Sequence, residues 1–146
     1  MRIKRIRIAK QRFLPLLLRG DESEAQLHGY LKQADLYALF DPDLKTVCAV
    51  TLEGEVCQIR NIATQLRAQG QGYGKRMIDH LCRLYADRCT TMLAGTGESP
   101  LTLPFYERCG FSVAYREKDH YLKYYDTPIY EDGVQLIDKI YLTRHL

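Results

Sequence analysis

The segment QGQGYGKR, residues 69–76, decides the fold, because it joins a predicted strand to a predicted helix. Its three glycines permit backbone angles that other residues avoid, and they let a ligand approach the main chain closely. The helix that follows presents unpaired N–H groups and the positive end of its dipole at this turn. Arg67, Lys75 and Arg76 add positive charge. The segment therefore predicts a site for a pyrophosphate-like anion, with a tight turn that binds nothing as the alternative.

The spacing of these glycines fits neither of two common nucleotide-binding motifs. The dinucleotide pattern G-x-G-x-x-G would need a glycine at Tyr73 or Lys75. The P-loop would need Ser or Thr at Arg76, directly after Lys75. Nicotinamide cofactors and nucleoside triphosphates are therefore poor fits.

Upstream of the turn, the sequence predicts two helices and a meander of strands. An amphipathic strand is expected over residues 2–7, followed by a helix over residues 11–19. Asp21 is the expected N-cap of a second helix that ends near Gln33. Three strands follow over residues 36–40, 46–52 and 55–63, with turns at residues 41–43 and at Gly54.

Downstream of the turn, helices and strands alternate. Apolar residues at helical spacing predict a helix over residues 72–88, and a short strand follows over residues 91–94. A shorter helix should end at Cys109 with Gly110 as its C′ residue. Two closing strands, residues 111–115 and 135–142, flank a tyrosine-rich connection over residues 118–133. This order, β-α-α-β-β-β-α-β-α-β-β, predicts an α/β fold with helices packed on a mixed sheet.

Composition limits the classes of protein that remain. The 146 residues suit a single domain, residues 1–146, and no apolar stretch is long enough to span a bilayer. Five cysteines without metal-type spacing favour small buried side chains in a reducing compartment, and hence a cytoplasmic protein. A net charge of +3 is too weak to indicate nucleic-acid binding, although it suits a small polyanion.

Two motifs together resemble the GNAT superfamily of N-acetyltransferases. Residues 69–74 match its acetyl-CoA signature, Q/R-x-x-G-x-G/A, and the strand QIRNIAT before them, residues 58–64, is similar to the family's fourth strand. FYERCGF, residues 105–111, resembles a second hallmark of the family. The resemblance implies about seven mostly antiparallel strands, splayed in the middle and flanked by about four helices. It also implies transfer of an acetyl group from acetyl-CoA to a primary amine by direct attack in a ternary complex, without a metal. A homodimer is compatible with it.

The resemblance also assigns residues to the cofactor. The pantetheine arm of CoA should pair with the free edge of the fourth strand at Asn61, Ile62 and Ala63, where an N–H would face the thioester oxygen. Ser99 occupies a position where relatives contact the cofactor, and N-cap ahead of Pro100 is its alternative role. The pyrophosphate should be held by Gln69, Gly70, Gln71, Gly72, Tyr73, Gly74 and Lys75.

Tyr106 matches the tyrosine that serves as general acid in many relatives. Reference pKa values of about 10 for a phenol and 8.5 for a thiol make proton transfer to the CoA thiolate uphill by roughly 2 kcal/mol. The phenol would stay neutral and able to donate at pH 7. Gln58 stands where the family often has glutamate and cannot accept a proton, although it could orient a water or the substrate. Glu55 would lie on the opposite face of a regular strand.

The sequence specifies less about the residues that would bind the amine that accepts the acetyl group. The connection before the last strand carries aromatic and acidic residues that suit a cationic amine, and they could equally cover the core or a dimer surface. These residues are Tyr121, Tyr124, Tyr125, Asp126, Tyr130, Glu131 and Asp132. A non-catalytic acyl-CoA-binding or regulatory module is the main alternative, supported by Gln58 alone. An interaction domain that uses the basic and tyrosine residues is a weaker one.

Overall fold

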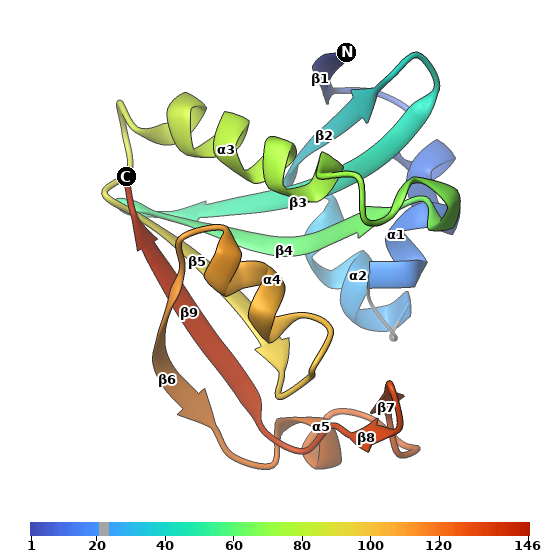
Figure 1. The fold of residues 1–146 in the computed structure, drawn as a ribbon, viewed down its shortest axis with the longest axis vertical. Coiled ribbons are helices and arrows are strands. Elements are labelled where there is room, and N and C mark those ends of the chain that lie inside the picture. The colour runs from blue at the N-terminus through green and yellow to red at the C-terminus, as the bar shows by residue number, and fades with distance from the viewer. Residues whose placement is uncertain (21–23) are drawn as a thin grey trace.

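A seven-stranded sheet forms the centre of the molecule in a computed structural model, which describes residues 1–20 and 24–146 (Figure 1). Its strand order is β1-β2-β3-β4-β5-β9-β6, and every neighbouring pair is antiparallel except β4–β5. This confirms the mixed, mostly antiparallel sheet. The strands are β1 (Arg2–Ile6), β2 (Asp35–Phe40), β3 (Leu44–Glu53), β4 (Val56–Thr64), β5 (Thr91–Gly97), β6 (Ser112–Glu117) and β9 (Lys139–His145).

Helices cover both faces of this sheet (Figure 1). Tyr37 and Leu39 of β2 face a core cluster with α3 and α4, whereas Leu36 and Ala38 face a second cluster with α1 and α2. The alternation follows from the two-residue period of a strand. The helices are α1 (Leu14–Gly20), α2 (Glu24–Leu31), α3 (Tyr73–Tyr85), α4 (Leu103–Arg108) and α5 (His120–Lys123), with 3₁₀ turns η1 (Lys10–Phe13) and η2 (Leu66–Ala68).

Three details differ from the sequence prediction. The first predicted helix is split into η1 and α1; α1 starts just before Pro15, which fits an α-helix only within its first turn. The connection over residues 118–133 holds α5 and runs into a hairpin of β7 (Tyr130–Glu131) and β8 (Val134–Gln135), with a turn at Asp132 and Gly133. The last strand accordingly begins at Lys139, four residues later than expected. Asp21, the expected N-cap, lies outside the described residues.

The sheet opens between β4 and β5, as the resemblance implied. These parallel strands pair only from Val56–Ile59 to Thr91–Ala94, although β4 continues to Thr64 and β5 to Gly97. At the point of separation β4 carries a bulge, because Ile59 and Asn61 pair with consecutive residues of β3 and Arg60 is the extra residue. A bulge bends a strand and increases its twist, so it helps to turn the end of β4 away from β5.

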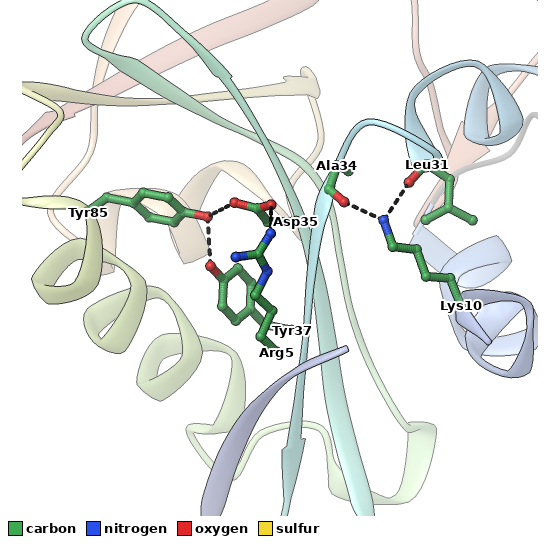
Figure 2. A network of polar contacts seen from close by, with 7 residues as sticks. All are labelled: Arg5, Lys10, Leu31, Ala34, Asp35, Tyr37 and Tyr85. Carbon is green, nitrogen blue, oxygen red and sulfur yellow. Dashed lines mark hydrogen bonds and ion pairs between the residues drawn. The ribbon is translucent and has the colours of Figure 1, made fainter. Parts of the chain in front are cut away.

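A polar network fixes α3 on the sheet (Figure 2). The Tyr85 phenol at the end of α3 donates to an Asp35 oxygen at 2.8 Å and contacts the Tyr37 hydroxyl at 2.8 Å. Arg5 of β1 donates to the other Asp35 oxygen at 2.7 Å. Figure 2 also shows Lys10, whose ammonium caps α2 by donating to the carbonyls of Leu31, the last residue of the helix, and of Ala34 just beyond it. The network ties the far end of α3 to β2, which leaves the glycine turn at its other end in a defined place.

The cysteine prediction is confirmed: all five are free thiols and buried, as small apolar side chains would be. Among the described residues, no group of His, Cys, Asp or Glu side chains is arranged to hold a metal ion. None of the helices in residues 1–20 and 24–146 is long and apolar enough to cross a membrane.

Candidate functional site

A cavity of about 750 Å³ lies where β4 and β5 separate. Its wall combines the end of β4, the glycine turn before α3, one side of α4, and the connection between β6 and β9. We call it the central cavity. Nine of the predicted residues are on its wall, namely Asn61, Ile62, Gln69, Gly70, Gly72, Tyr73, Gly74, Lys75 and Tyr106. Four others are not part of that wall, namely Gln58, Ala63, Gln71 and Ser99.

The glycine turn has the geometry of an anion site. Gly70 and Gly72 adopt φ angles of 76° and 85°, which L-residues with a side chain rarely adopt. The first bond of α3 runs from the Arg76 N–H to the Gly72 carbonyl at 3.0 Å. The N–H groups of residues 73–75 therefore have no acceptor within the helix, and they stand at its positive end.

The side chains around this turn have specific partners. The Tyr73 hydroxyl donates to Asp41 at 2.8 Å, and this bond raises the pKa of the phenol. Lys75 pairs with Asp79 at 2.9 Å, so its charge is partly neutralised. Gln71 is exposed, and its amide donates to the carbonyl of Arg67. The backbone of the turn, more than its side chains, is thus available to a ligand.

Gly74, on the cavity wall, also packs against α4. It has no positive φ angle, and a Cβ there would lie 3.0 Å from the Phe105 ring of α4. The absence of a side chain at Gly74 therefore allows the close packing of α3 against α4 at the cavity.

The exposed edge of β4 lies beside the cavity. Beyond Ile59 and the bulged Arg60, residues 61–64 pair with β3 on one side and have no pairing with β5 on the other. Ile62 lines the cavity here, whereas the Ala63 side chain is buried in the opposite core cluster. The Asn61 side chain, only 3% exposed, donates to the Leu17 carbonyl at 2.7 Å. This bond anchors α1 against β4.

Tyr106 lies in the first turn of α4, whose second residue is Pro104. It lines the cavity although it is buried, and its ring makes edge-to-face contacts with Phe105 and Phe111. Burial raises the pKa of the phenol well above its usual value, which keeps it protonated. Direct proton transfer from this phenol to a thiolate would be more uphill in free energy than the reference pKa values imply. The difference shrinks if the same dry environment raises the pKa of the thiol as well. Gly110, with a φ of 88°, ends this helix as expected.

Gln58 and Ser99 are not on the cavity wall. Gln58 belongs to the part of β4 that pairs on both sides, opposite Thr51 and Leu93. The assigned helix after Ser99 begins at Leu103 with Thr102 at the N-cap position. Ser99 nevertheless makes capping contacts in the turn before it, because its carbonyl accepts the Leu103 N–H at 3.2 Å and its hydroxyl accepts the Leu101 N–H. The same buried hydroxyl donates to Glu131.

Some residues of the connection between β6 and β9 line the cavity, and others lie at the surface. Tyr121 and Tyr125 line the cavity with their rings stacked at 5.3 Å, and Glu131 lies on the same wall. Tyr124 and Tyr130 are exposed. The aromatic and acidic composition indicated this connection as a candidate binding site for the amine. It could not show which of its residues face the cavity. Other wall residues carried no signal in the sequence, namely Gly20, Arg60 and Lys139.

Comparisons with known proteins agree with this architecture. A family model described as an acetyltransferase (GNAT) domain matches residues 33–113. An uncharacterized N-acetyltransferase of Bacillus subtilis (strain 168), YvbK, is 32% identical, across 87% of this chain and 84% of that protein. A GNAT family acetyltransferase from Elizabethkingia anophelis, crystallised with acetyl-CoA bound, is 26% identical with a TM-score of 0.92, covering 99% and 97% of the two chains. A Bacillus subtilis acetyltransferase in complex with CoA is 28% identical with a TM-score of 0.89, covering 99% and 98%.

The chain therefore belongs to the GNAT acetyltransferase family. It is an acyltransferase, with the splayed sheet, the glycine turn and the tyrosine of the second motif in one site.

Proposed function

We propose that this protein transfers an acetyl group from acetyl-CoA to a primary amine by direct attack in a ternary complex. The observation that carries the proposal is the separation of β4 from β5, which exposes a backbone edge along the central cavity. Two relatives of similar fold were crystallised with acetyl-CoA or CoA, which supports the same ligand here.

The residues of the cavity suit that ligand. The edge at residues 60–64 can pair with the amides of a pantetheine arm, and an N–H near Ile62 can donate to the thioester oxygen as negative charge develops. The N–H groups of residues 73–75 can hold the pyrophosphate. Acetyl-CoA would supply the reactive carbonyl and a thiolate leaving group. Tyr106, held neutral by burial, would then protonate that thiolate.

A covalent acetyl-enzyme is disfavoured by the state of the cysteine on the cavity wall. Burial raises the pKa of the Cys109 thiol to about 11. Only about one thiol in ten thousand would be ionised at pH 7, and the thiolate is the nucleophilic form. Direct attack by the amine is therefore the route proposed, because it does not require Cys109 as a nucleophile.

Replacing Cys109 with alanine should accordingly leave turnover within about twofold of the wild type. Initial velocities measured over a grid of acetyl-CoA and amine concentrations should give intersecting lines in both proteins. Parallel lines, or loss of turnover in Cys109→Ala with the fold intact, would contradict direct attack.

Replacing Gly72 with alanine should weaken acetyl-CoA binding about tenfold, measured by calorimetry. The positive φ angle costs roughly 1 kcal/mol, and the new methyl group would stand beside the proposed pyrophosphate. Gly54 provides the matched control, because it also has a positive φ angle and open space around a Cβ, but it lies off the cavity wall. Gly54→Ala should lose similar stability and keep its affinity. Equal affinities in the two variants would remove the turn from the ligand site.

The direct test of the function combines two measurements. Calorimetry reports acetyl-CoA binding, and a thiol reagent reports CoA release with a panel of primary amines. Binding together with amine-dependent thiol release supports the proposal. Binding without release from any amine would favour the non-catalytic acyl-CoA module.

We also infer that residues 1–146 act as one domain in a reducing compartment such as the cytoplasm. The sheet runs from β1 to β9, and the cavity wall draws on residues from α1 to β9. Five buried free thiols support the compartment.

A further inference from the structure

The cavity wall carries more positive than negative side chains, and this bears on which amine accepts the acetyl group. Among the described residues that line the cavity, Glu131 is the only carboxylate, and the wall holds no histidine. Five cations share that wall, namely Arg19, Arg60, Lys75, Arg108 and Lys139. A single acidic group in a basic cavity marks a position where positive charge on a ligand would be favoured.

The Glu131 carboxylate is held by a buried residue from a distant part of the chain. The Ser99 hydroxyl, whose residue is only 1% exposed, donates to Glu131 Oε1 at 3.2 Å. The orientation of that hydroxyl is set in turn by the Leu101 N–H, which donates to it at 3.1 Å. This arrangement positions the carboxylate from behind and keeps it on the wall of the cavity.

The surroundings of Glu131 contain the other groups that acyl transfer needs. Glu131, Tyr121 and Tyr106 all line the same cavity. Burial first, and then neighbouring groups that include Tyr121 and Glu131, raises the pKa of Tyr106. The stacked rings of Tyr121 and Tyr125 provide aromatic surface that attracts cations. One end of the cavity thus combines a carboxylate, two phenol rings and the proposed acid.

We propose that Glu131 binds the ammonium group of the acceptor and removes its proton, so that the acceptor is a primary amine that is cationic at neutral pH. This inference rests on the proposed function. It assigns the proton-accepting role that Gln58 cannot perform to a residue 73 positions later in the sequence. Ser99 is then a positioning residue for that carboxylate.

The proton balance of the step is complete. The ammonium gives one proton to the Glu131 carboxylate, and the nitrogen lone pair forms a bond to the acetyl carbonyl carbon. The carbon–sulfur bond breaks with its electron pair on sulfur, which takes the Tyr106 proton. The second nitrogen proton, passed through water, restores the phenol. Glu131 finally releases its proton to solvent, so that an ammonium and a thioester yield an amide, a thiol and one proton.

The test compares Glu131→Gln with the wild type by thiol release, using the best cationic amine of the panel. At pH 7 the variant should lose about 10–100-fold in kcat/KM, while its affinity for acetyl-CoA stays unchanged. Without the carboxylate only the neutral amine can react, so kcat/KM of the variant should rise about tenfold per pH unit between pH 7 and 9. The kcat/KM of the wild type should change much less over that range. A merely structural defect would lower kcat/KM by the same factor at both pH values.

Asp132→Asn is the matched control, because it removes the same charge from the same hairpin at an exposed residue off the wall. Its φ angle of 49° also suits asparagine. Turnover of this variant should equal that of the wild type.

Ser99→Ala tests the positioning role. Loss of a donor to the ionised carboxylate should raise the pKa of Glu131 and move the acid limb of the kcat/KM profile to higher pH. An unchanged acid limb would remove Ser99 from the arrangement.

The outcomes separate the two proposals. An active wild type with an equally active Glu131→Gln variant would overturn the role of Glu131 and leave the proposed function standing. A wild type that binds acetyl-CoA but acetylates no cationic amine at pH 7 or 9 would overturn both.

Discussion

Replacing Tyr106 with phenylalanine should lower kcat by about 10²–10³-fold and leave the dissociation constant for acetyl-CoA within about twofold. The phenol lines the cavity, and burial keeps it protonated across the pH range of an assay. It is therefore present as a proton donor whenever the thiolate leaves. Steady-state thiol release gives kcat, and calorimetry gives the affinity.

The substitution is conservative for the fold. Phenylalanine keeps the edge-to-face contacts with Phe105 and Phe111, so the packing of α4 should be preserved. Tyr115→Phe is the matched control, since Tyr115 is exposed and stacks on Tyr141 outside the cavity. Unchanged kcat in Tyr106→Phe would show that another group or water protonates the thiolate.

Much of the fold followed from local patterns in the sequence. The alternation along β2 separates Tyr37 and Leu39 from Leu36 and Ala38, and these pairs pack against different helices. The turn at residues 69–76 has a local signature, because only glycine readily adopts the φ angles of Gly70 and Gly72. Such features depend on residues close in the chain, which is why the sequence predicts them.

The acceptor end of the cavity depends on contacts between residues far apart in the chain. Ser99 and Glu131 are 32 positions apart, and the sequence carries no pattern that pairs them. The hairpin that presents Glu131 has strands of only two residues, too short for any periodicity to appear. The bulge at Arg60 likewise arises from pairing with β3. For these reasons the sequence named Glu131 only as one of seven candidates in its connection, and the structure places it on the cavity wall, whereas Gln58 and Ser99 lie off that wall.

Replacing Gly20 with alanine should destabilise the protein by about 2 kcal/mol, or roughly 6–8 °C in Tm for a domain of this size. A Cβ at Gly20 would lie 2.1 Å from the Asn61 side-chain oxygen and 3.1 Å from the Ile62 carbonyl oxygen. Asn61 cannot easily move, because its amide donates to both Leu17 and Tyr30. The clash should therefore displace the edge of β4 and also weaken acetyl-CoA binding.

Gly29→Ala provides the matched control for this prediction. Gly29 lies within α2, and a Cβ there would meet nothing within 4 Å, so alanine should stabilise the helix by about 0.5–1 kcal/mol. Thermal unfolding and calorimetry of both variants separate the clash at Gly20 from a general effect of replacing glycine.

A double-mutant cycle then identifies the atoms that clash. Asn61→Ala alone should destabilise the protein, because it removes the amide that binds the Leu17 carbonyl. Once that side chain is gone, Gly20→Ala has lost its nearest obstacle and should cost much less than in the wild type. Purely additive losses would show instead that the methyl group is opposed by the backbone of β4.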